Sequence, residues 1–235
     1  EDFFIGDLLQ ELLSPLFPLV MPAVTSLWSY GETGYHSLAA AVVKQRYARE
    51  AMASAFRILG EGQLSLTKFV LVTDQAVDLK DFRATLEHVL ARTHPETDLY
   101  VFSNLSMDTL DYTGPEVNRG SKGIWLGLGD PVRDLPRQFS APSLPSGCRE
   151  VLVFAGGCLV VDAPSYADEP GAAARFASDP AFAGWPLVVV TDDAQRPLAH
   201  ARVVVKLAHG PEIVRETGAD GRARFEHALA TELGL

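Results

Sequence analysis

The sequence predicts an α/β fold, in which a layered, largely parallel but mixed sheet carries helices on its faces. Short runs of apolar and β-branched residues, such as 68–73 and 187–191, have the length and composition of buried strands. Between such runs, residues 47–59 and 81–90 place apolar side chains at helical spacing. Strands that alternate with helices in this way are typical of an α/β architecture.

In the first half of the chain we expect, in order, a helix over 3–14, an extended or looped stretch over 15–30, a strand over 35–43, a helix over 47–59 and a strand over 68–73. Pro15 and Gly60 end the two helices. Asp78 is expected to cap the next helix, and a strand over 99–103 follows it. This order of strand, helix and strand has the length of a right-handed parallel crossover.

Residues 104–149 are predicted to be mostly loop around an apolar piece at 124–128, because they are rich in Gly, Pro, Asp and Ser. After them we expect strands over 151–154 and 158–161, a weak helix over 170–177, a strand over 187–191, and a β-hairpin or meander over 201–207, 213–216 and 222–226. Two regions are therefore expected: an α/β domain at 1–145 and a strand-rich extension at 146–235.

Two segments, Lys68–Asp74 and Pro186–Asp192, resemble each other, since each is a valine-rich run that ends in an acidic turn. The likeness is explained if unrelated buried strands are both rich in valine and both end in an acidic turn. The alternative is a partial repeat, in which one strand unit has been duplicated.

Composition excludes several classes of function. The chain has 235 residues, is 47% hydrophobic and carries a net charge of −10, so it repels phosphate backbones and is not expected to bind nucleic acid. Prolines interrupt its longest apolar stretch, residues 12–24, which is too short for an integral membrane segment. Two cysteines, Cys148 and Cys158, are typical of a reducing cytoplasm, although a single bridge between them is the alternative.

The common catalytic signatures are absent from the sequence, among them Gly-x-Ser-x-Gly and His-Glu-x-x-His. The segment 114–122 looks like a P-loop, but five residues separate its glycines and Ser121 comes before Lys122. A glycine-rich turn still presents backbone N–H groups to anions, so Gly120, Ser121 and Lys122 form a candidate anion-binding loop. The alternative is a flexible surface loop.

Lys68 stands at the head of a predicted buried strand. A charged side chain there must either face solvent or meet a counter-charge.

Four segments, taken together, resemble the C-terminal region of the UbiD family, the prenylated-flavin-dependent decarboxylases. They are the helix that begins the chain with its proline-rich exit, residues 34–47 (GYHSLAAAVVKQRY), residues 67–74 (TKFVLVTD) and residues 107–123 (MDTLDYTGPEVNRGSKG). Their order along the chain carries the likeness, which covers about residues 1–140.

The resemblance implies a carboxy-lyase that removes CO2 from an aromatic or α,β-unsaturated acid, and membership of the longer, quinone-biosynthesis type is an option. Such enzymes use prenylated FMN with a divalent metal (Mn) and K at its phosphate. Their catalytic Glu-Arg-Glu set and their metal ligands precede the segment seen here. No catalytic residue or metal ligand is therefore assigned in this chain, which alone is expected to be inactive and to bind no cofactor. A start at Glu1, without Met, is what a piece of a longer protein would show.

The resemblance also implies roles for individual residues. Lys68 matches a lysine that approaches the cofactor phosphate. Met107, Leu110 and Tyr112 match a loop that covers the substrate side of the flavin, and plain loop-anchoring contacts are the alternative for these three. The family builds homo-oligomers, either dimers or hexamers, so apolar residues such as Phe17, Leu19, Val20 and Trp28 are expected at an interface or in the domain's own core.

Two rival functions stay open. One is a non-catalytic interaction or oligomerisation module. The other is a small-molecule-binding domain with a site in the 104–123 loop, lined by Lys68, Asp108, Asp111 and Lys122. In addition, residues 187–226 resemble small β-sandwich modules of the carboxypeptidase-regulatory or Cna-B type.

Overall fold

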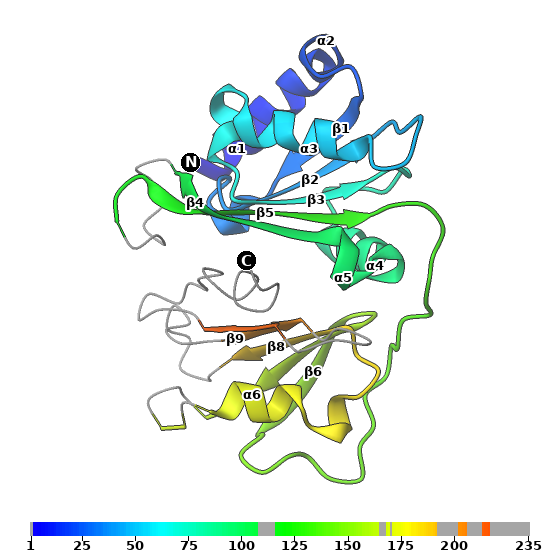
Figure 1. Ribbon diagram of the computed structural model, residues 1–235, viewed down its shortest axis with the longest axis vertical. Helices are drawn as coiled ribbons and strands as arrows, with labels where there is room; N and C mark the ends of the chain where they lie inside the picture. The colour runs from blue at the N-terminus through cyan, green and yellow to red at the C-terminus, as the bar shows by residue number, and fades with distance from the viewer. Residues whose placement is uncertain are drawn as a thin grey trace.

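The computed structural model describes residues 2–107, 116–164, 168–169, 171–191, 202–205 and 213–216. These residues form two five-stranded sheets with helices on their faces, so the predicted α/β class is confirmed (Figure 1). No helix in this described part of the chain is both long and apolar enough to cross a bilayer.

The first sheet has the order β1-β2-β3-β5-β4. Its strands are β1 Val24–Ser29, β2 Leu38–Val43, β3 Phe69–Thr73, β4 Leu99–Ser106 and β5 Arg119–Gly127. The three central strands β2, β3 and β5 are parallel, and the outer strands β1 and β4 run antiparallel to their neighbours. The sheet is therefore mixed, with a parallel centre.

Helices cover both faces of this sheet. They are α1 Asp2–Leu13, η1 Ser14–Leu16, α2 Phe17–Val20, η2 Gly31–Thr33, α3 Ala51–Gly60, η3 Gly62–Leu66, α4 Phe82–Arg92 and α5 Pro95–Asp98. Alternate strand residues point to opposite faces, so Val70 packs with Ile58 of α3 while Leu71 packs with Val89 of α4. Figure 1 shows α3 on one side of the sheet and α4 on the other.

One local prediction was incomplete and two were wrong. The stretch 15–30, expected to be extended or looped, contains the extended strand β1 but also the helix α2. The cap of α4 is Asp81 rather than Asp78, since the Asp81 side chain accepts a hydrogen bond of 3.0 Å from the Ala84 N–H. Strand β4 is not the parallel partner of β3, because β5 lies between them and pairs antiparallel with β4.

The parallel crossover that begins with β3 is thus completed by β5, which includes residues predicted to be loop. Helix α4 lies very close to this strand: a Cβ on Gly127 would stand 2.7 Å from the Val89 Cα atom. At the other end of β5, the Phe69 ring lies across Gly123, where an added Cβ would stand 2.5 Å from a ring carbon. Only glycine at these two positions lets the helix and the ring approach the strand so closely.

The second sheet has the order β10-β9-β8-β7-β6. Its elements are β6 Glu150–Ala155, β7 Cys158–Asp162, α6 Ala172–Ala177, η4 Pro180–Phe182, β8 Leu187–Thr191, β9 Arg202–Val205 and β10 Ile213–Glu216. Phe176, Phe182 and Trp185 pack in its core with Leu159 and Val188. The strand predicted over 222–226 lies outside the described residues.

The same order of elements occurs twice in the chain. A β1–β2 hairpin is followed by α3 and by β3, which is parallel to β2, and a β6–β7 hairpin is followed by α6 and by β8, which is parallel to β7. The two similar segments Lys68–Asp74 and Pro186–Asp192 contain β3 and β8, which hold equivalent places in the two units.

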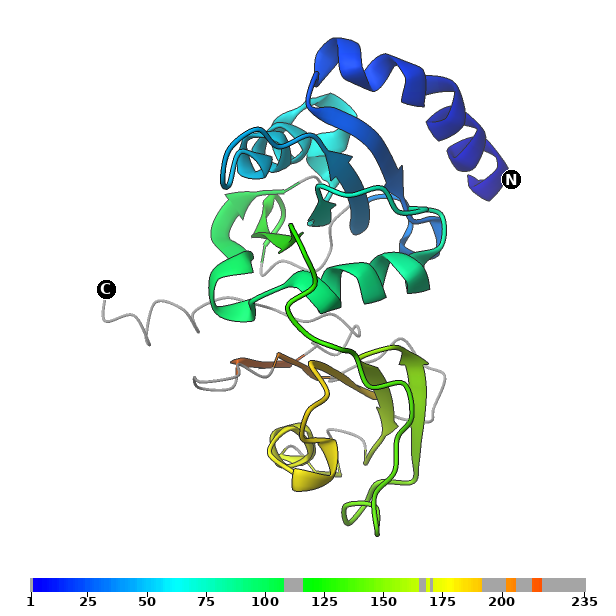
Figure 2. The same ribbon diagram turned by 90° about the vertical axis from the view of Figure 1, so that its right-hand side faces the viewer.

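Helix α4 joins the two sheets. It lies on the side of the first sheet that faces the second sheet (Figure 2), and Leu86 and Leu90 pack against Cys158 and Leu187. Glu87 accepts hydrogen bonds of 2.6 Å from the Gly156 N–H and from Arg137. Burial raises the pKa of Glu87, but these two donors outweigh burial and hold it below its ordinary value.

Candidate functional site

The amino ends of β2, β3 and β5 meet at one border of the first sheet. This border, called here the amino edge, consists of residues 34–37, 67–68, 107 and 120–122. Backbone hydrogen bonds hold it together: the Lys68 N–H donates to the His36 carbonyl at 3.0 Å, and the Gly123 N–H donates to the Lys68 carbonyl at 2.8 Å.

Two lysines lie side by side on the amino edge. Phe69 and Gly123 are partners in register on adjacent strands, so Lys68 and Lys122, one residue before each, are neighbours on the same face. Only 7% of Lys68 and 6% of Lys122 is exposed. The interpretation of Lys68 as a solvent-facing side chain is therefore wrong. Two cationic side chains are thus buried next to each other at this edge.

Lys122 has a structural task as well. Its Nζ atom donates to the carbonyl oxygens of Leu59 at 3.2 Å, of Thr67 at 3.1 Å, and of Ser65. An ammonium group has three N–H donors, so these three carbonyls match its capacity. Lys122 thereby ties β5 to the turn that connects α3 with β3.

The candidate anion loop needs a correction. Gly120, Ser121 and Lys122 are buried residues of β5 and do not form a surface loop. The loop conformation was wrongly predicted because Gly and Ser weaken β-propensity, whereas antiparallel pairing with β4 fixes this segment as a strand. Its role in anion binding stays a prediction. Lys122 thus contributes its charge to the amino edge, while its donors serve backbone carbonyls.

Met107 closes the end of β4 at the same edge. It is 4% exposed, and its N–H donates to the Asn118 carbonyl at 3.1 Å. Asn104 and Asn118 both have positive φ angles, 56° and 63°, which asparagine tolerates better than most residues. Leu110 and Tyr112, like Asp108 and Asp111, lie outside the described residues, so the substrate-loop role stays a prediction.

Helix α1 is attached to the amino edge by Tyr35. The Tyr35 hydroxyl donates to Asp7 Oδ1 at 3.1 Å, and its ring lies so close to Gly6 that an added Cβ would stand 2.4 Å from the ring. The sequence pattern alone did not link Gly6 with Tyr35. The signal that could have done so is the glycine inside an otherwise apolar helix.

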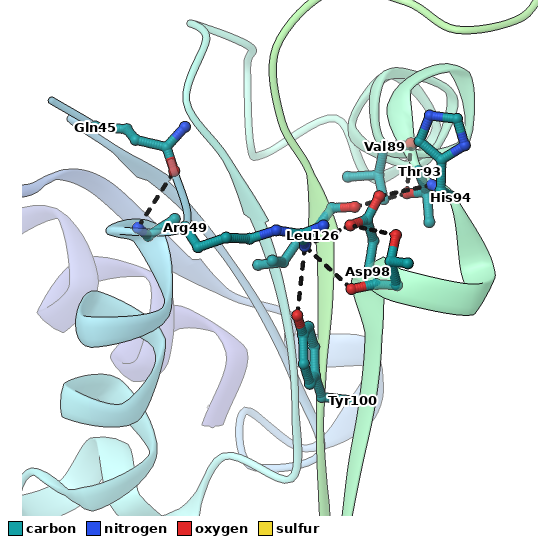
Figure 3. A network of polar contacts seen from close by, with 10 residues as sticks. Gln45, Arg49, Val89, Thr93, His94, Asp98, Tyr100 and Leu126 are labelled. Carbon is teal, nitrogen blue, oxygen red and sulfur yellow. Dashed lines mark hydrogen bonds and ion pairs between the residues drawn. The ribbon is translucent and has the colours of Figure 1, made fainter. Parts of the chain in front are cut away.

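The opposite border of the sheet holds a structural network of polar groups (Figure 3). Asp98 is 7% exposed and accepts hydrogen bonds from Arg49 at 2.5 Å and from the His94 N–H at 2.7 Å. Arg49 also lies 3.4 Å from the Tyr100 hydroxyl, and the Thr93 hydroxyl lies 2.8 Å from the Leu126 carbonyl. This network ties the start of α3 to β4 and β5.

A second histidine at this border, His88, is also paired within the fold. His88 Nε2 lies 2.8 Å from the Thr73 hydroxyl. Burial, followed by the charge of Arg92, lowers the pKa of His88. Among the described residues, His, Cys, Asp and Glu form no group of three or more that could hold a metal ion.

The apolar residues expected at an interface divide into two groups. Phe17 packs against the core of the first sheet, and Trp28 is half-buried with Lys80 Nζ 5.0 Å from its ring centre. By contrast, 78% of Leu19 and 49% of Val20 is exposed. They extend an exposed apolar surface on α1 and α2, called here the α1–α2 face, whose other members are Leu8, Leu9, Leu12, Leu13 and Leu16.

The family model described as the C-terminal domain of 3-octaprenyl-4-hydroxybenzoate carboxy-lyase matches residues 3–127, just over half of the chain. The chain belongs to the UbiD family. The matched residues contain the whole first sheet and the amino edge, so Lys68, Met107 and Lys122 all lie within the UbiD part of the chain.

Curated relatives match a longer part of the chain than the family model does. An uncharacterized protein from Chlamydia trachomatis is 53% identical over 203 residues, which cover 86% of this chain and 34% of that protein. A Chlamydia pneumoniae protein, named as a subunit of 4-hydroxybenzoate decarboxylase, is 51% identical over 193 residues, covering 82% of this chain and 32% of that protein. The chain thus spans about a third of the length of these relatives, and the matches are long enough to include part of the extension.

Among solved structures, the UbiD-class enzyme HmfF from Pelotomaculum thermopropionicum, in complex with FMN, is similar with a TM-score of 0.45 and 17% identity. The similarity covers 58% of this chain and 30% of that one.

Proposed function

We propose that this UbiD chain is the C-terminal, flavin-adjacent part of a carboxy-lyase that decarboxylates an aromatic or α,β-unsaturated acid. The observation that carries the proposal is the pair of buried lysines, Lys68 and Lys122, on the amino edge. Lysine side chains are common partners of anionic groups, and a compact ammonium suits a phosphate. The proposed reaction belongs to quinone biosynthesis in the cytoplasm.

The residues of the amino edge fit the phosphate end of prenylated FMN. Lys68 would contact the phosphate, and the charge of Lys122, fixed by three carbonyls, would strengthen the field there. When bound, the prenylated flavin supplies the group that accepts the electron pair left by departing CO2. Met107, with Leu110 and Tyr112, would exclude water on the substrate side. We expect the Glu-Arg-Glu set and the Mn²⁺ and K⁺ ligands in residues that precede this segment.

Replacement of Lys68 by Met in the full-length protein is expected to weaken FMN binding by about tenfold or more, because a charge-assisted hydrogen bond contributes about 1.5–3 kcal/mol. Lys68→Arg should keep part of the affinity. Titration of FMN fluorescence measures both. Lys80→Met is the matched control, since Lys80 pairs with Glu11 on the surface. Unchanged FMN affinity in Lys68→Met would refute the phosphate role.

We also propose that the UbiD chain forms a homo-oligomer through the α1–α2 face. Exposed apolar side chains gathered on two adjacent helices are typical of an interaction site. The charge of a glutamate buried in such an interface would be costly, so the double variant Leu12→Glu/Leu19→Glu is expected to weaken self-association by about tenfold or more.

Sedimentation velocity over a range of concentrations measures this self-association. Val117→Glu is the control, because Val117 is as exposed as Leu19 but belongs to neither α1 nor α2. A monomeric wild-type chain, or equal self-association of the double variant and the wild type, would contradict the proposal.

A further inference from the structure

An apolar chamber lies between the two sheets, beside α4. Its volume is about 520 Å³, within the range of small-molecule sites. Side chains of the first sheet, of α4 and of the second sheet together form its walls, and they include Phe69, Val101, Trp125, Phe154, Val160 and Val189. The chamber therefore exists only because the extension lies against the UbiD sheet.

The walls keep accessible apolar surface. Phe69, Val101 and Trp125 on one side, and Val160 and Val189 on the other, are half-buried rather than buried. Two sheets in direct contact would remove such side chains from water and gain about 25 cal/mol per Å² of apolar area. The sheets are in contact through α4, where Leu86 and Leu90 meet Cys158 and Leu187, and they stand apart where the chamber lies.

The chemistry of the walls restricts the ligand. The described lining contains no charged side chain, and its polar groups are confined to the side chains of Thr33, Ser37 and Cys158 and to the buried indole N–H of Trp125. A charged ligand would lose its hydration without gaining a counter-charge. The sheet walls on both sides are apolar and aromatic, so the chamber selects an uncharged hydrocarbon.

The chamber begins close to the amino edge, on the opposite face of the sheet. Phe69 and Gly123 line it, and they directly follow Lys68 and Lys122 in the chain. We propose that the chamber binds an uncharged hydrocarbon chain of the isoprenoid or fatty type. Such a chain is either a free ligand or the tail of an acid whose carboxylate lies at the amino edge.

Binding of tritium-labelled farnesol to the full chain, measured by equilibrium dialysis, tests the proposal. Saturable binding is expected. Val160→Phe and Val189→Phe, which fill the chamber, should each weaken it by about tenfold or more. Val132→Phe, an exposed change outside the chamber, should leave it unchanged. Should Val160→Phe fail to fold, Val160→Thr keeps the volume, adds a hydroxyl to the apolar wall and is expected to weaken binding severalfold.

Two outcomes would overturn the proposal. The first is the absence of saturable farnesol binding, which would result if other residues of the chain fill the chamber. The second is an equal affinity for farnesol in the wild type and in the filled variants. Binding of a geranyl-substituted 4-hydroxybenzoate distinguishes a free hydrocarbon ligand from the tail of an acid. If the chamber takes the tail of an acid, this compound binds at least about tenfold more tightly than farnesol, and the filled variants weaken binding of both. If the ligand is a free hydrocarbon, the carboxylated compound binds no more tightly than farnesol. Because no flavin is present, these results do not depend on the proposed carboxy-lyase activity.

Discussion

Lys122→Met is expected to lower the free energy of unfolding by about 3 kcal/mol. Methionine keeps the apolar stem but cannot donate, so the carbonyls of Leu59, Ser65 and Thr67 lose a partner. A buried acceptor left unsatisfied costs about 1–3 kcal/mol. Removal of a buried charge returns part of this loss, because burial of an ammonium itself costs several kcal/mol. The three carbonyls outweigh that gain, since methionine has no N–H to replace the three donors of the ammonium.

Urea denaturation followed by circular dichroism measures this change. Arg119→Met is the matched control, because Arg119 lies on the same strand with an exposed side chain and should change the stability by less than about 0.5 kcal/mol. If Lys122→Met were as stable as Arg119→Met, the turn between α3 and β3 would not depend on the ammonium.

Asp98→Ala is expected to cost about 3 kcal/mol of stability, because it removes a buried carboxylate that accepts charge-assisted and backbone hydrogen bonds. The His94 N–H and the Arg49 guanidinium both lose their acceptor. Arg49 is 46% exposed and turns to water when the carboxylate is gone, so much of the cost comes from the lost His94 bond and from the space left beside β4.

A double-mutant cycle with Arg49→Met separates these contributions. Arg49→Met alone should cost more than a surface ion pair, which contributes about 0.2–1 kcal/mol, because the buried Asp98 carboxylate then loses its cation. The free energy of unfolding of the double variant should be at most about 0.5 kcal/mol lower than that of Asp98→Ala. Strictly additive losses would show that the two side chains do not interact.

The sequence predicted most of the elements whose apolar pattern is local. Helices α1 and α3 and strands β3 and β8 fall close to their expected places, because each has a period or a run of its own. Strand β1 was missed because the prolines before it hide a short strand that pairing with β2 defines. The first half of β5 was missed because its Gly and Ser residues have low β-propensity, and pairing with β4 makes it a strand.

The candidate site was predictable in part. Lys68 was singled out, because a lysine at the head of a buried strand is unusual in itself. The carbonyl contacts of Lys122 could not be foreseen, since they join residues 55 to 63 positions apart in the chain. The same holds for the contact of Arg49 with Asp98, 49 positions away. Partners of this kind follow from the tertiary fold, and the local pattern carries no signal for them.

The position of β5 between β3 and β4 has a consequence for synthesis on the ribosome. Strand β5, which pairs with one side of β3, is the last strand of this sheet to be synthesised. It begins some 46 residues after the end of β3. Until residue 127 has left the exit tunnel, this valine-rich strand presents an open edge in the nascent chain. Open edges of high β-propensity recruit strands from other chains. The nascent protein is therefore most exposed to misassociation during the interval in which α4 and β4 are being made.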